Sequence, residues 1–411
     1  MEGWKSYTLN EVCSLITDGK HGDCENETNS GYFFLSAKDV VEGFLKYENA
    51  RQITYKDFLE IHRRTNLEPN DILISNSGTI GRMAVAREIQ QTRRTTFQKS
   101  VAILKPIKKL IHPFFLYYNL LSQTDEIKNI AGGTTQQNLL LGDIKRFQII
   151  IPPLPLQHRI AEILGALDDK IELNRQMNHT LEQMAQALYK HYFVDGIDPE
   201  NLQEGWRNGT IGDLCFVQNG FAFKSSSFQN QGDARIIKIT NIENNAVEIE
   251  KTQFVPFDIA NTIDKKFHIL SGNFLIAMTG AEVGKVGIVP VHEETILLNQ
   301  RVGSLKDTIK YGAVISYVLL ANNKMQDKLL DTAVGSAQPN ISSSDIENIV
   351  TIIPSSNVIE FLGSKLHLFC SQTSQNLSEN LMLKNIRDIL LPKLISCEII
   401  PSDLQTIEQA L

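Results

Sequence analysis

The sequence lacks the motifs by which most enzymes are recognised. It contains no HExxH, no GxSxG and no GxGxxG after a predicted strand, so zinc proteases, α/β-hydrolases and dinucleotide-binding folds are not indicated. The segment 280–285 resembles a phosphate-binding loop, but it has three residues between its glycines and Val286 follows the lysine. Such a loop needs four residues there and a Ser or Thr after the lysine. We therefore predict a chain without catalytic residues.

Cysteines and long apolar runs are also scarce. The five cysteines are odd in number and form no CxxC pair, which indicates reduced thiols and argues against a metal site. No apolar run approaches the roughly 20 residues that span a membrane. The first residues, MEGWKSYTLNEVC, contain no basic segment followed by an apolar core. These absences predict a cytoplasmic protein.

The net charge of −7 argues weakly against a nucleic-acid partner. The charge is uneven, however, because residues 1–153 hold 19 basic and 17 acidic side chains. Nine of the basic residues lie between 64 and 109, with only three acidic residues among them. A local basic face can bind phosphate within an acidic protein. From composition alone, a solvated charged face is the simpler interpretation.

The stretch Gln157–Asp195 predicts one long helix. It has no Pro and a single Gly, and Pro residues precede it. Apolar residues recur in it at steps of three and four, which is the period of a helical stripe: Ile160, Ile163, Leu167, Ile171, Met177, Leu181, Met184 and Leu188. Such a helix would be roughly 58 Å long at about 1.5 Å per residue.

A second helix repeats the first at an offset of 202 residues. The seven-residue seam of the first helix passes through Asn174, and that of the second passes through Asn376 at the same step. Paired seams predict an antiparallel coiled coil, in which these asparagines would fix the register. The alternative is two amphipathic helices that pack separately, each with its asparagine at a wet edge.

The same offset relates the segments before the two helices. FFLSAKDV (from Phe33) aligns with RIIKITNI (from Arg235), and GGTTQQNLLLGDIKRFQIIIP (from Gly132) aligns with VGSAQPNISSSDIENIVTIIP (from Val334). This agreement indicates a duplication. Each copy mixes short apolar runs, turn clusters and a helical stretch, so we predict an α+β fold with an internal pseudo-twofold repeat. The predicted boundaries are 1–153 and 199–355 for the globular domains, 154–198 and 356–397 for the helices, and 398–411 for a tail.

Several segments together resemble one protein family. IPPLPLQHRIAEILGALDDKIELN and ALYKHYFVD are similar to the central helical region of the specificity subunits of type I restriction–modification systems. GFAFKSSSF, DILISNSGTIGR and GTTQQNL are similar to parts of that family's target recognition domains. The resemblance covers nearly the whole chain. It implies two tandem target recognition domains separated by the two antiparallel helices.

The resemblance also implies a function. The chain would be a non-catalytic subunit in which each domain reads one half of a bipartite, asymmetric DNA target. The helices would set the unread gap and dock two methyltransferase subunits, and restriction (translocase) subunits would join them. The chain itself would bind no cofactor, because S-adenosylmethionine, ATP and Mg would lie on those partners. A structural adaptor that bridges proteins without DNA is the alternative, and an enzyme with an unrecognised site is a third hypothesis.

The repeat divides the candidate DNA contacts into two classes. Shared basic or amide positions should grip phosphate, since the two domains would read different half-sites: Arg82, Gln98 and Lys99 in the first domain, and Lys285, Gln300 and Arg301 in the second. Unshared polar residues should read bases: Lys20, His21, Arg93, Arg94, Asn219 and Lys224. The alternative for each residue is a surface ion pair.

Overall fold

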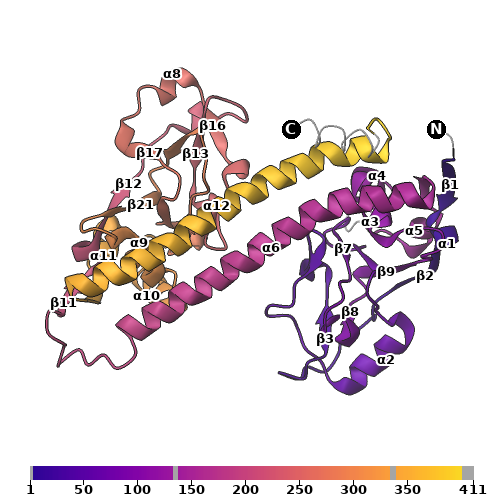
Figure 1. The fold of residues 1–411 in the computed structure, drawn as a ribbon, viewed down its shortest axis with the longest axis horizontal. Helices are drawn as coiled ribbons and strands as arrows, with labels where there is room; N and C mark the ends of the chain where they lie inside the picture. Colours follow the sequence, from indigo (N-terminus) through magenta and orange to yellow (C-terminus); the bar gives the residue numbers. More distant parts are fainter. Residues whose placement is uncertain (1–2, 133–137, 334–338, 400–411) are drawn as a thin grey trace. The chain divides into compact units, whose positions relative to one another are not determined.

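The structure is a computed structural model that describes residues 3–132, 138–333 and 339–399. The chain divides into two compact units, Met1–Asp169 with Lys384–Leu411, and Lys170–Leu383. Each unit contains one globular domain and parts of two long helices, α6 (Leu154–Phe193) and α12 (Ser356–Ile395) (Figure 1). The domain boundaries drawn from the sequence stay a prediction.

The N-terminal domain is built on an antiparallel sheet in the order β2-β9-β6-β7. Its strands are β2 (Cys13–Asp18), β9 (Val101–Pro106), β6 (Ile72–Ser75) and β7 (Met83–Val85). The central strands β6 and β9 are almost continuously apolar, because both faces of the sheet are covered. One face carries the apolar cluster that includes Ile74 and Phe115, and the other carries the cluster that includes Leu73 and Phe97.

Shorter elements complete this domain. Strands β1 (Lys5–Thr8) and β10 (Gln148–Ile151) pair antiparallel and bring the ends of the domain together. Strands β3 (Phe33–Leu35) and β8 (Thr95–Phe97) pair in parallel, and β4 (Val40–Val41) forms a hairpin with β5 (Phe44–Leu45). The helices are α1 (Leu9–Val12), η1 (Ala37–Asp39), α2 (Tyr55–Thr65), η2 (Thr92–Arg94), α3 (Pro113–Ser122), α4 (Thr124–Asn129) and α5 (Leu141–Arg146).

The C-terminal domain repeats this order of elements. Its main sheet has the order β12-β21-β18-β19-β15-β14, and a second sheet has the order β16-β13-β20-β17. The strands are β11 (Arg207–Thr210), β12 (Cys215–Asn219), β13 (Ala234–Ile237), β14 (Ile242–Glu243), β15 (Ala246–Val247), β16 (Gln253–Val255), β17 (His268–Ile269), β18 (Phe274–Ala277), β19 (Val286–Ile288), β20 (Thr295–Leu298), β21 (Val302–Asp307) and β22 (Val350–Ile353). The helices are α7 (Ile211–Leu214), η3 (Ser225–Ser227), η4 (Ile239–Asn241), η5 (Ile249–Lys251), α8 (Phe257–Ala260), η6 (Lys265–Phe267), η7 (Gly280–Glu282), α9 (Gly312–Leu320), α10 (Asn323–Ala333) and α11 (Ser343–Glu347).

The duplication extends to single contacts. The isolated bridge between Ser77 and Asn138 recurs, at an offset of 202, between Thr279 and Asn340. The parallel pair β3–β8 recurs as β13–β20. The predicted repeat of a mixed α/β domain is therefore confirmed. One local difference is that the second copy is one residue shorter before β20, so that Phe97 of β8 corresponds to Leu298 of β20 and Val101 of β9 to Val302 of β21, an offset of 201.

The two long helices are antiparallel where they pair. Within Lys170–Leu383, Asn174 Nδ2 donates to Asn380 Oδ1 (2.9 Å) and Asn376 Nδ2 donates to Asn178 Oδ1 (2.8 Å). Residue numbers along α6 therefore increase while those of their partners on α12 decrease, as in an antiparallel pair of helices. Asn174 and Asn376 are both buried, so neither lies at the wet edge that the alternative required. Their role in fixing the register stays a prediction.

Each unit also buries helix residues in the core of its domain. In Lys170–Leu383, Ala185 of α6 and Leu362 of α12 join the cluster around Val318 of α9. In the other unit, Ile160 of α6 and Leu394 of α12 join the cluster around Phe115 of α3. The helices are thus part of the domain cores.

Candidate nucleic-acid interface

Loops gather at one edge of the main sheet in the N-terminal domain. Strands β2 and β6 end at this edge and β9 begins there, because Asp18 pairs with Ala102 and Ser75 with Val101. The chain after β2 lies against the chain before β9, since Lys20 N donates to Phe97 O (2.8 Å) and Lys99 N donates to Lys20 O (3.0 Å). We call residues 19–23, 76–82 and 98–100 the N-terminal loop edge.

Glycine is required at position 19, where these two loops approach each other most closely. A Cβ added at Gly19 would lie 1.9 Å from the carbonyl oxygen of Phe97, closer than any side chain tolerates. Because Gly19 has no side chain, the loop that carries Lys20 can lie against the loop that carries Gln98 and Lys99.

Five of the predicted DNA contacts lie on the N-terminal loop edge. Arg82 and Lys99 are exposed, and neither side chain pairs with another group within the described part of the chain. Gln98 is partly exposed. Lys20 is held by carboxylates, since its Nζ lies 3.2 Å from Glu60 Oε2, and His21 Nε2 lies 3.4 Å from Asp18 Oδ2. The available cations here are therefore Arg82 and Lys99.

The C-terminal domain has an equivalent loop edge, residues 219–224, 278–285 and 299–301. Strand β12 ends there at Asn219, which pairs with Gly303, and Met278 N donates to Arg301 O (3.0 Å). Gln300 N donates to Phe221 O (2.9 Å), so the same pair of loops meets as in the first domain. This places Lys285, Gln300 and Arg301 at one edge. The same contacts match Lys99 with Gln300 and Ser100 with Arg301, so the alignment of Lys99 with Arg301 drawn from the sequence is wrong by one residue.

The C-terminal candidates differ in whether their side chains already have partners within the protein. Arg301 is exposed and its side chain has no partner among residues 3–132, 138–333 and 339–399. Lys285 forms an ion pair with Glu282. Asn219 Nδ2 donates to Ser343 Oγ (3.3 Å), whereas Lys224 is exposed just before η3.

Arg93 and Arg94 lie apart from the other candidates. They form η2 and precede β8, whereas Gln98 and Lys99 follow that strand. Arg93 is 3.5 Å from Glu88, and Arg94 is exposed beside Gly31. The structure therefore places these two arginines at the opposite end of β8 from the N-terminal loop edge.

Most of the sequences GTTQQNL (from Gly133) and GSAQPN (from Gly335) lie outside the described residues, which leave out 133–137 and 334–338. The described residues that follow include Asn138, which bridges to Ser77, and Asn340, which bridges to Thr279. Asn138 and Asn340 therefore each contact a loop edge.

Known proteins share this architecture. A family model described as "Type I restriction modification DNA specificity domain" matches residues 1–183 and 203–360. The chain belongs to this family. The type I restriction enzyme HindI specificity subunit of Haemophilus influenzae is 25% identical over 97% of this chain and 100% of that protein. The MjaVIII specificity subunit of Methanocaldococcus jannaschii is 23% identical over 86% of this chain and 83% of that protein.

A solved member of the specificity-subunit family has the same fold. The crystal structure of a type I restriction–modification S subunit from M. genitalium aligns with a TM-score of 0.58 at 20% identity, over 95% of this chain and 96% of that one. Two tandem specificity domains with two long helices, as predicted from the sequence, are therefore confirmed. No helix within the described ranges is long and apolar enough to cross a membrane.

The basic stretch of this specificity-family chain is not one uniform face. Arg64 is held by Asp18 (3.1 Å), and Arg87 by Asp169 (3.2 Å) and the ring of Phe44. Lys105 is largely buried, 2.6 Å from Asp71. Several of these cations are thus structural. Among residues 3–132, 138–333 and 339–399, no cluster of three or more His, Cys, Asp or Glu side chains could hold a metal ion.

Sequence reasoning missed a buried polar triad in the N-terminal unit. Tyr118 Oη donates to Asp168 Oδ2 (2.7 Å), and Arg387 Nη1 donates to Asp168 Oδ1 (2.8 Å). Both charged side chains are nearly inaccessible, with 6% of Asp168 and 13% of Arg387 exposed. The available signal was the offset of the two long helices, because Cys370 and Ala185 stand at the positions equivalent to Asp168 and Arg387 and both join the apolar core.

Proposed function

We propose that this chain is the DNA-reading subunit of a type I restriction–modification complex, with each domain reading one half of a bipartite, asymmetric target. The supporting observation is the pair of equivalent loop edges. Each presents an exposed cation without an ion-pair partner within the described ranges, Lys99 in one domain and Arg301 in the other, in loops ordered by the same backbone contacts. The two cations stand one position apart in equivalent loops, since Arg301 corresponds to Ser100. Exposed cations on such loops suit phosphate contact, which positions a protein on DNA irrespective of sequence.

Under this proposal, the bases are read by polar residues that the two domains do not share. His21 stands in the N-terminal loop edge, and Asn219 and Lys224 stand in the C-terminal one. The three differ in the number and geometry of their hydrogen-bond donors and acceptors, so they match different base edges. Lys20 is less available for this task because Glu60 and Asp57 hold its ammonium group.

The long helices hold the two reading domains and dock the partners. Two of the predicted stripe residues of α6, Met177 and Met184, are exposed instead of buried, as are Phe361, Leu368 and Met382 of α12. Exposed apolar side chains along a helix indicate a protein-binding surface. We assign this surface to two methyltransferase subunits, to which restriction (translocase) subunits add. S-adenosylmethionine, ATP and Mg belong to these partners and not to this chain.

The methylation pattern of a genome tests this proposal. A strain carrying the gene with its neighbours is compared with a deletion of this gene alone. Loss of adenine methylation at one bipartite motif supports the proposal and supplies both half-sites. An unchanged pattern, with the partner methyltransferase expressed, contradicts it. That result favours the protein-bridging adaptor, to which the acidic balance of residues 206–354 (13 basic, 15 acidic) also points.

A further inference from the structure

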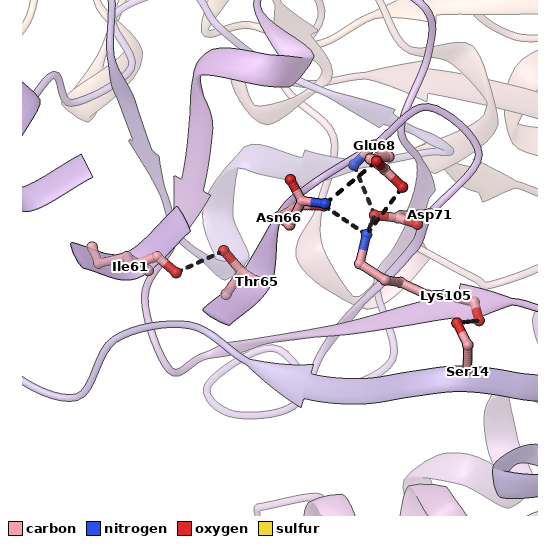
Figure 2. Close-up of polar contacts among 7 residues, drawn as sticks. All are labelled: Ser14, Ile61, Thr65, Asn66, Glu68, Asp71 and Lys105. Carbon is pink, nitrogen blue, oxygen red and sulfur yellow. Dashed lines mark hydrogen bonds and ion pairs between the residues drawn. The ribbon is translucent and has the colours of Figure 1, made fainter. Parts of the chain in front are cut away.

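One lysine recurs in both domains with different surroundings. In the N-terminal domain, Lys105 Nζ donates to Asp71 Oδ2 (2.6 Å) and to the carbonyl oxygen of Asn66 (2.6 Å). The carboxylate of Glu68 lies 3.8 Å away, and the backbone N of Glu68 also donates to Asp71 Oδ2 (2.8 Å). Figure 2 shows this arrangement around Lys105. Two carboxylates thus neutralise the buried ammonium group.

The C-terminal domain keeps this frame and loses both carboxylates. Lys306 Nζ donates to Asn273 Oδ1 (2.9 Å), and the backbone N of Leu270 donates to the same oxygen (3.1 Å). Asn273 therefore stands in the place of Asp71, and Leu270 in the place of Glu68. The lysine remains, whereas two negative charges beside it are gone.

A cavity opens where these charges are missing. Its volume is about 630 Å³. It is lined by Phe216, Gln218, Lys265, Lys266, His268, Leu270 and Lys306. One carboxylate also lines it, that of Asp307, and its Oδ1 accepts the backbone N–H of Ala313 at the start of α9 (2.7 Å). Three ammonium groups therefore face one carboxylate.

The lysines of the cavity are available to a ligand. Lys265 and Lys266 are exposed, and neither pairs with a carboxylate in the part of the chain that the structure describes. Lys306 is mostly buried, and this burial lowers the pKa of its ammonium group. An ammonium group has three N–H donors, and the hydrogen bond to Asn273 engages one of them. A bound anion would offset the cost of keeping this charge out of water.

The charge and the shape indicate the class of ligand. Three lysines against one carboxylate leave an excess of about two positive charges, which matches the charge of about −1.5 to −2 on a phosphate monoester. Lysine binds phosphate as a point charge, without the planar fork that arginine offers to carboxylates. Phe216 and Leu270 are exposed and form an apolar surface of the cavity that suits a sugar or a base.

We propose that this cavity binds a phosphate group, supplied either by the DNA backbone or by a free nucleotide. It is distinct from the loop edges, because Phe216 and Lys306 pair at the opposite end of β12 and β21 from Asn219 and Gly303. The DNA source rests on the proposed function, whereas the free-nucleotide source does not. In the N-terminal domain the equivalent lysine, Lys105, is already paired with the carboxylates of Asp71 and Glu68.

The decisive variant is Asn273→Asp, which restores the carboxylate of the N-terminal domain. An aspartate oxygen accepts the same two hydrogen bonds as Asn273 Oδ1, and the first domain folds with this solution at Asp71. The control is Asn208→Asp, which adds the same charge to an exposed position on β11 of the same domain. Lys266→Glu, an exposed site on η6, is a second variant that leaves the buried frame untouched.

Two titrations of the full-length chain separate the sources. In the first, calorimetry follows binding of inorganic phosphate and of adenosine 5′-monophosphate. If the source is a free nucleotide, Asn273→Asp and Lys266→Glu each weaken binding by about tenfold or more, because each removes favourable interaction with a charged ligand. Asn208→Asp leaves binding unchanged.

In the second titration, the chain assembled with its methyltransferase subunits binds duplex DNA at several salt concentrations. If the source is the DNA backbone, Asn273→Asp lowers the slope of log K against log salt by about 0.9, the value for one phosphate contact. The proposal is overturned if Asn273→Asp and Lys266→Glu behave like Asn208→Asp in both titrations. If the wild-type assembly binds no DNA at all, the proposed function fails, and the calorimetry alone decides the cavity.

Discussion

At the scale of single residues, the two units fill equivalent buried positions of the long helices with different side chains. The N-terminal unit buries Asp168 with Arg387 and Tyr118. The other unit has Cys370 and Ala185 at the positions equivalent to Asp168 and Arg387, and Tyr317 of α9 stands in the place of Tyr118. A buried ion pair has to recover the cost of desolvating both charges, so it adds little net stability compared with an apolar set. Removing one partner is different, because the other charge is then buried alone.

We therefore expect Asp168→Ala to destabilise the N-terminal unit by about 3–5 kcal/mol. The loss arises because Arg387 stays buried without a counter-charge and Tyr118 Oη loses its acceptor. The measurement is thermal unfolding of the full-length chain, in which this unit should melt at a lower temperature.

The equivalent residues of the other unit suggest a combined variant that should recover the lost stability. Combining Asp168→Cys with Arg387→Ala copies the two residues of the other unit and should recover most of the loss, since replacing both charges leaves no buried charge unpaired. Equal destabilisation by Asp168→Ala and by the double variant would show that the ion pair is a net stabiliser.

At the scale of elements, one glycine fixes how closely α12 approaches the C-terminal domain. A Cβ added at Gly363 would lie 2.3 Å from the Cβ of Tyr311. Tyr311 has a positive φ of 67° just before α9, so the local backbone has little freedom to retreat. At the matching place on α6, residue 161 is an alanine, which the other domain accommodates.

We expect Gly363→Ala to destabilise the chain by about 1–3 kcal/mol, although alanine favours a helix by about 1 kcal/mol. The control is Gly165→Ala on α6, where an added Cβ meets no atom within 4 Å. That variant should gain up to about 1 kcal/mol from propensity alone. Urea unfolding of the two variants should give shifts of opposite sign, and two stabilising shifts would contradict the close approach at Tyr311.

The helices and the repeat could be predicted from the sequence, because both rest on regular spacing. Periodicity alone could not assign the helix faces, and Met177 and Met184 of the predicted stripe are exposed. It also could not separate Arg93 and Arg94 from the loop edge, because that depends on β8 running between them and Gln98. The pairing of Lys105 with Asp71 was hidden for a similar reason, since the second copy is one residue shorter before β20 and its lysine, Lys306, therefore stands one residue off the common offset.

At the scale of the whole molecule, a net charge of −7 is compatible with DNA binding because contact is local. The Debye length is about 8 Å at physiological ionic strength, so distant acidic residues are screened from a phosphate at a loop edge. What counts is the number of cations that reach phosphates. Among the phosphate candidates, the cations without ion-pair partners within the described ranges are Arg82 and Lys99 in one domain and Arg301 in the other.

The salt dependence of DNA binding should therefore count these contacts one by one. In the assembled methyltransferase complex, Arg82→Ala, Lys99→Ala and Arg301→Ala should each lower the slope of log K against log salt by about 0.9. Lys109→Ala is the control, because Lys109 is exposed but follows β9 at the end opposite Lys99. The loss for Lys99→Ala combined with Arg301→Ala should be additive, since the two residues belong to separate compact units. A slope that responds equally to Lys109→Ala would mean that DNA responds only to total charge, and the loop edges would not be the interface.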